Sequence, residues 1–100
     1  MTLVVLKPED YPMLVGQENW FLIHPNNIDC EFCVPVGAAA VCKQPLLGIF
    51  HKNLPYPLVN YDKDHAWITV QLSPEVFYKM PLYVFARHFD AEAFVRRVRD

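Results

Sequence analysis

Residues 58–72 read LVNYDKDHAWITVQL and carry the strongest structural signal in the chain. From Ala66 to Leu72 every second residue is apolar, which is the period of a strand with one buried face. The LVNY stretch before it favours a partner strand, and the polar DKD triplet at 62–64 has the length of a hairpin turn. The sequence therefore predicts an antiparallel β-hairpin here.

Further strands are predicted on the N-terminal side of this hairpin, where short runs rich in valine, leucine, isoleucine and phenylalanine recur. They cover residues 2–7, 20–24, 32–36 and 46–51. Prolines and asparagines predict a turn or one helical turn at 8–11, a turn at 25–27 and an irregular segment at 53–57.

The sequence does not decide whether residues 37–43 form a helix or an irregular segment. Their three alanines favour a helix, but Gly37 and Pro45 leave room for about two turns at most.

Helices are expected on the C-terminal side of the hairpin. Ser73, Pro74 and Glu75 are typical of a helix start, because serine caps free amides, proline suits the first turn and glutamate faces the positive end of the dipole. Pro81 would end that helix. Residues 82–89 fit a helix or a strand equally well.

A last helix is predicted to begin after Asp90. Its apolar residues recur at helical spacing and are Ala91, Phe94, Val95 and Val98. All the elements together predict an α+β fold, with a small mixed, mostly antiparallel sheet and short helices concentrated at the C-terminal end.

A chain of 100 residues without internal repeats is expected to form one globular domain over residues 1–100. Hydrophobic residues make up 53% of it, which exceeds the usual share of about 45–50%. No apolar run is long enough for a transmembrane helix, and residues 1–7 lack the basic region of a signal peptide. We therefore expect a soluble cytoplasmic protein with reduced cysteines and no membrane partner.

One group of residues resembles a metal-binding motif. Cys30 and Cys33 have C-x-x-C spacing, and together with Cys42 and one histidine they would provide the four ligands of a zinc site. The second closely spaced pair of such sites is missing. We therefore predict free thiols, no metal ligand and no cofactor, with a zinc-stabilised domain as an alternative. Dithiol redox chemistry is disfavoured, because no helix start follows the pair.

No catalytic pattern emerges, so we expect a protein that is not an enzyme. Ser73 is the one serine, and it is predicted to cap a helix. The scattered glycines at 16, 37 and 48 do not form a phosphate-binding loop. Pairings of a cysteine with a histidine are possible in any chain with several of each, and they indicate nothing specific.

The aromatic residues from Tyr56 onward are more numerous than one small core needs, and a fully buried core is the alternative reading. We expect some of them to form a protein-binding surface, because tyrosine, tryptophan and arginine dominate binding hot spots. The predicted contact residues are Tyr61, Trp67, Tyr78, Tyr83, Arg87, Arg96 and Arg97.

The predicted function is a small regulator, inhibitor or adaptor, of the kind that phages and mobile elements encode, which docks on another protein. Self-association into a homodimer is a further possibility. The alternative is a nucleic-acid-associated regulator that uses the basic C-terminal helix, since all arginines follow residue 86. A net charge of −2 argues against a nucleic-acid partner.

Overall fold

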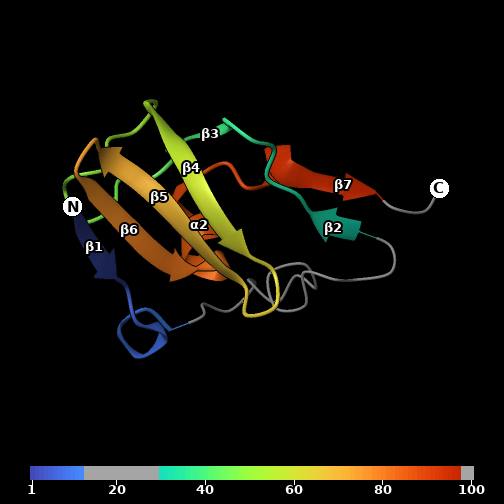
Figure 1. Cartoon of the computed structure of the whole chain (residues 1–100), viewed down its shortest axis with the longest axis horizontal. Coiled ribbons are helices and arrows are strands. Elements are labelled where there is room, and N and C mark those ends of the chain that lie inside the picture. The colour runs from blue at the N-terminus through green and yellow to red at the C-terminus, as the bar shows by residue number, and fades with distance from the viewer. Residues whose placement is uncertain (13–29, 98–100) are drawn as a thin grey trace.

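The computed structural model describes residues 1–12 and 30–97. Its centre is a five-stranded sheet with the strand order β1-β6-β5-β4-β3 (Figure 1). The strands are β1 (Thr2–Val5), β3 (Ala39–Val41), β4 (Pro55–Asp62), β5 (Trp67–Ser73) and β6 (Val76–Pro81). β1 runs parallel to β6, and the other neighbours are antiparallel. The predicted fold class, α+β with a mixed and mostly antiparallel sheet, is confirmed.

The predicted hairpin is confirmed as the pair β4 and β5, with Tyr61 opposite Ile68. The carboxylate of Asp62 accepts hydrogen bonds from the backbone N–H groups of Asp64 (3.1 Å) and His65 (3.4 Å), which stabilises the turn. A bulge at Val59 shifts the register, so that Leu58 and Tyr61 belong to the same face of the sheet.

The helix predicted to begin at Ser73 is wrong. β5 ends at Ser73, Pro74 and Glu75 form a turn, and the chain returns as β6 alongside β5. Serine, proline and glutamate suit a turn as well as a helix start. The valine, phenylalanine and tyrosine that follow favour a strand, and β6 lies between β5 and β1 in the sheet.

Residues 82–89 adopt the helical alternative. Helix α2 (Leu82–His88) buries Leu82, Val84 and Phe85 and contacts β5 and β6. The 3-10 helix η1 (Pro8–Asp10) provides the expected single turn after β1.

The helix predicted after Asp90 is also wrong. A 3-10 turn, η2 (Glu92–Phe94), leads into β7 (Val95–Arg97), which pairs antiparallel with β2 (Cys30–Phe32). The backbone N–H of Cys33 donates to the carbonyl of Phe94 (2.9 Å) and extends this ribbon. Pairing with so distant a partner overrides the local helical spacing.

Other strand boundaries differ from the prediction because turns and non-local pairing decide them. The strand predicted at 32–36 is wrong, since β2 ends at Phe32. The strand predicted at 46–51 is a turn, in which Leu47 and Gly48 have φ angles of 55° and 68°. Residues 39–41 form a strand, and β4 begins inside the segment predicted to be irregular. The predicted strand at 20–24 and turn at 25–27 lie outside the described residues.

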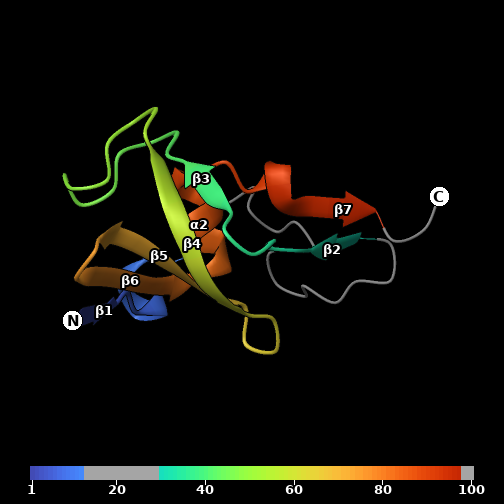
Figure 2. The ribbon, with the colours of Figure 1, turned by 45° about the horizontal axis from the view of Figure 1, so that its top comes forward.

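The core lies between one face of the sheet and α2 (Figure 2). At its centre the ring of Phe50 makes edge-to-face contacts with three other rings. They are Tyr56 at 4.9 Å, Tyr78 at 5.3 Å and Phe89 at 5.4 Å between centroids. Phe89 in turn stacks on Phe85 at 5.1 Å. Aromatic rings therefore join a turn, two strands and the end of the helix.

Replacing Phe50 by alanine is expected to lower the free energy of unfolding by about 3–5 kcal/mol, because it removes a fully buried ring and leaves a cavity. Leu54→Ala is the matched control, since Leu54 is 49% exposed and such changes stay within about 0.5 kcal/mol. Urea unfolding followed by circular dichroism measures both. Equal effects of the two substitutions would contradict a core centred on Phe50.

Candidate functional site

The face of the sheet opposite α2 is not covered by any other described element (Figures 1 and 2). Residues that lie opposite each other on neighbouring strands point to the same face. Ile68, Val70 and Met80 are fully buried in the core. The residues that alternate with them on β5 and β6 therefore point away from the core.

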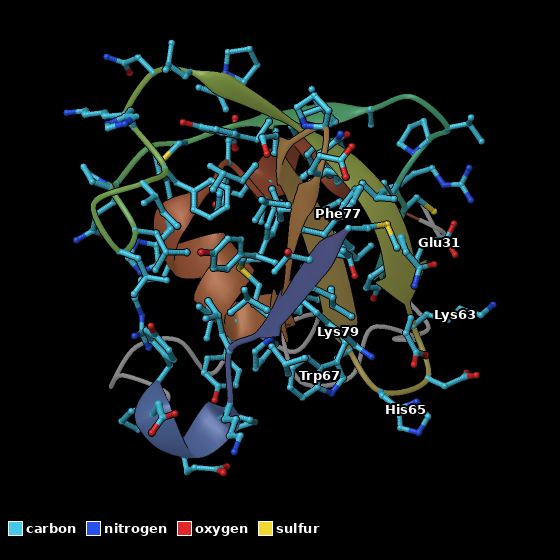
Figure 3. All side chains as sticks on the ribbon, turned by 60° about the vertical axis from the view of Figure 1, so that its left-hand side comes forward. Glu31, Lys63, His65, Trp67, Phe77 and Lys79 are labelled. Carbon is cyan, nitrogen blue, oxygen red and sulfur yellow. The ribbon has the colours of Figure 1, made fainter. Side chains whose placement is uncertain are left out.

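We call this surface the outer face and define it by Leu3, Val5, Trp67, Phe77 and Lys79. The register places Leu3 beside Phe77 and Val5 beside Lys79. Figure 3 shows Trp67, Phe77 and Lys79 together on this side of the sheet. Local alternation on three strands thus builds one surface.

Trp67 and Lys79 form the best-defined contact of the outer face. The ammonium group of Lys79 lies 5.6 Å from the centre of the Trp67 ring. A cation–π contact of this kind contributes about 0.5–1 kcal/mol near solvent. The contact with Lys79 fixes the position of the half-buried Trp67 ring. Thr69, two residues further along β5, is only 9% exposed.

Leu3 and Val5 extend the outer face to the edge of the sheet. Leu3 is 55% exposed and Val5 is 46% exposed. Phe77, next to Leu3 on β6, is half-buried. A group of large apolar side chains on an uncovered face is typical of an interaction surface.

The contact residues predicted from the sequence do not lie together in the structure. Of these predicted residues, only Trp67 lies on the outer face. Tyr78 packs on Phe50 in the core, and Tyr61 lies on the core side with its ring 5.0 Å from Phe32. The surplus of aromatic residues therefore goes mainly into the core.

The remaining predicted contact residues lie on α2 and β7. The hydroxyl of Tyr83 donates to the carbonyl of Pro8 (3.5 Å), and the guanidinium of Arg87 donates to that of Pro12 (2.7 Å). Arg96 forms an ion pair with Glu31, and the backbone of Arg97 lies opposite Cys30.

Sequence reasoning missed Leu3, Val5, Phe77 and Lys79. The run Thr2–Val5 is almost uniformly apolar and does not reveal which side chains face outward. Phe77 and Lys79 alternate with Val76, Tyr78 and Met80 in the pattern of a strand. That alternation could have identified them, but the apparent helix start at Ser73 obscured it.

Apart from the outer face, a pocket lies where β2 approaches the end of β4. This cavity of about 320 Å³ is lined by Glu31, Phe32, Cys33, Val34, Pro35, Tyr61 and Lys63. Figure 3 shows Glu31 and Lys63 at this border of the sheet. The hydroxyl of Tyr61 is buried with no hydrogen-bond partner among the described residues, and burial raises the pKa of this phenol.

Hydrogen bonding decides the charge states in this cavity. The thiol of Cys33 donates to the carboxylate of Glu31 at 3.1 Å, and Arg96 donates to the same oxygen. These two bonds lower the pKa of Glu31. The carboxylate and burial raise the pKa of Cys33, which lowers the fraction of the reactive thiolate.

The thiol of Cys42 belongs to the core. It is fully buried and donates to the backbone carbonyls of Gln44 (3.3 Å) and Phe50 (3.8 Å), and burial raises its pKa. Among the side chains that the structure describes, which do not include that of Cys30, no three cysteines, histidines, aspartates or glutamates lie close enough to hold a metal ion. The core position of Cys42 makes it a poor zinc ligand.

No protein-family model, curated protein or solved structure matches this chain. The part of the chain that the structure describes contains no helix long and apolar enough to cross a membrane.

Glu31→Gln is expected to speed the alkylation of Cys33 severalfold at neutral pH. The substitution removes the carboxylate that raises the pKa of Cys33, and only the thiolate reacts. Peptide mapping after a short exposure to iodoacetamide measures the rate at Cys33, with the buried Cys42 as internal control. An unchanged rate at Cys33 would show that Glu31 does not hold the thiol neutral.

Proposed function

We propose that this chain is a non-enzymatic module that binds a partner protein on the outer face of its sheet. The observation that carries the proposal is the contrast between the two faces. One face buries the aromatic core under α2, whereas the other presents Leu3, Val5, Trp67 and Phe77 with no described element over them.

The make-up of the outer face supports this function. Trp67 is a large ring held by Lys79, and Phe77 lies beside the exposed Leu3. Polar residues Asn60, Asp62 and Gln71 lie on the neighbouring positions of β4 and β5. Thr69 and Lys79 lie between Trp67 and Phe77, so the outer face mixes apolar and polar side chains, as protein interfaces do.

The cavity beside Tyr61 gives less support to an enzymatic function. Its thiol has a raised pKa, and the carboxylate that accepts its hydrogen bond has a lowered pKa and is therefore a weak base. Regulators, inhibitors and adaptors are the classes of protein that bind without such chemistry. The free thiols of Cys33 and Cys42 fit the reducing environment of the cytoplasm.

The nucleic-acid alternative loses its structural basis. The basic helix it requires is absent from residues 90–97, where η2 and β7 lie. Arg96 is paired with Glu31, and Arg87 donates to a backbone carbonyl.

A photo-crosslinking residue at position 77 is expected to capture one defined partner in cells that naturally contain the chain. The same residue at position 47 is the matched control, since Leu47 is 52% exposed and lies in the 46–50 turn, away from the outer face. Mass spectrometry of the crosslinked product identifies the partner.

The double variant Trp67→Thr/Phe77→Thr is expected to bind that partner at least about tenfold more weakly, because hot-spot rings contribute most of the affinity. Threonine keeps the preference for a strand, and circular dichroism confirms the fold. Crosslinking that is equal at positions 47 and 77, or binding that the double variant leaves intact, would overturn the proposal.

A further inference from the structure

The two edges of the five-stranded sheet differ. Beyond β3, the segment after α2 covers the edge: Cys42 bridges to Phe89, and the N–H of Asp90 donates to the carbonyl of Val41 (3.0 Å). Beyond β1, no strand or helix of the described part lies alongside (Figure 1). Among the described residues, the sheet therefore has one covered edge and one edge with no neighbour, which we call the open edge.

Backbone geometry shows which groups β1 offers at this open edge. The N–H of Thr2 donates to the carbonyl of Glu75 (2.7 Å), and the N–H of Leu6 donates to that of Lys79 (2.8 Å). In a parallel pair every second residue bonds to the neighbouring strand, so Val4 also faces β6. Leu3 and Val5 therefore direct their N–H and C=O groups outward.

Although β1 is short, with 4 residues, the open edge lacks the sequence features that usually prevent pairing. Charged side chains, prolines and bulges discourage an added strand. Thr2–Val5 contains no charge and no proline, and its register with β6 is continuous. Lys7 and Pro8 come only after the strand has ended.

We propose that β1 pairs antiparallel with β1 of a second copy of this chain, about a twofold axis at Val4. Leu3 then lies opposite Val5 of the second copy, and Val5 lies opposite its Leu3. Both residues exchange N–H···O=C bonds across the junction, so every outward backbone group of Leu3 and Val5 in both copies is satisfied.

The side chains explain why the occupant is a second copy. Leu3 meets Val5 of the second copy on the outer face, and the two Val4 side chains meet on the other face. Each contact is apolar on apolar, and an uncharged strand does not repel itself. Such a symmetric interface uses the same patch on both subunits and is closed.

Pairing at β1 joins the sheets of the two copies and brings their outer faces edge to edge. Because the junction is small, the dimer is expected to dissociate reversibly on dilution. The inference does not rest on the function proposed above, since it concerns the backbone edge and not the Trp67 and Phe77 rings.

Two charge variants test the register. In Leu3→Lys/Val5→Lys each lysine lies opposite a lysine of the second copy, whereas Leu3→Lys/Val5→Glu places each lysine opposite a glutamate. Both positions are exposed, so the monomer is expected to keep its fold, which circular dichroism checks. Analytical ultracentrifugation from about 1 µM to about 1 mM, a range that spans weak affinities, measures the dimer.

The native chain is expected to dimerise with rising concentration, and the double-lysine variant at least about tenfold more weakly. The lysine–glutamate variant is expected to recover the association. Hydrogen exchange at the amides of Leu3 and Val5 slows with concentration, while the amide of Val4 is protected throughout.

A native chain that stays monomeric over the whole range overturns the proposal. Equal dimerisation of the two charge variants also overturns it. Trp67→Thr/Phe77→Thr leaves the β1 edge intact and is expected to dimerise like the native chain. Failure of the edge pairing and failure of partner binding on the outer face are therefore distinguishable.

Discussion

The packing of Phe50 against Tyr56, Tyr78 and Phe89 is the interaction on which the rest of the structure depends. Without it, the 46–50 turn, β4, β6 and the end of α2 would share no common contact surface. Edge-to-face rings contribute about 0.5–1.5 kcal/mol beyond their buried area. These contacts all lie on one side of the sheet, whereas Trp67 and Phe77 lie on the other side.

This one-sided core explains both surfaces that we propose for binding. α2 covers only one face, so Trp67, Phe77 and Lys79 stay accessible on the other. The segment that follows α2 reaches the β3 edge and protects it through Phe89 and Asp90. No described element gives β1 such a cover, and this contrast is the basis for the two proposed surfaces.

The sequence pattern correctly predicted the elements that depend on residues close together in the chain. Alternation from Ala66 to Leu72 identified β5, and the DKD triplet identified its turn, because both depend on neighbours in sequence. β6 was missed because the residues at 73–75 suit a turn and a helix start equally. β7 was missed because its pairing with β2 links residues some 65 positions apart, such as Arg96 and Glu31. Of the outer face, the sequence predicted only Trp67. The other members lie on β1 and β6, and the pairing of these two strands, which the sequence does not reveal, brings them together.

The most direct test of a one-sided aromatic core is the solvent accessibility of side chains measured by NMR with a soluble paramagnetic agent. The expected result is strong broadening of the Leu3 and Val5 methyl signals and of the Trp67 and Phe77 rings. The signals of Ile68, Val70, Val84 and Phe85 are expected to stay sharp, because these side chains are fully buried. Equal protection of the two sets would contradict an uncovered outer face and remove the basis for the proposed protein-binding surface.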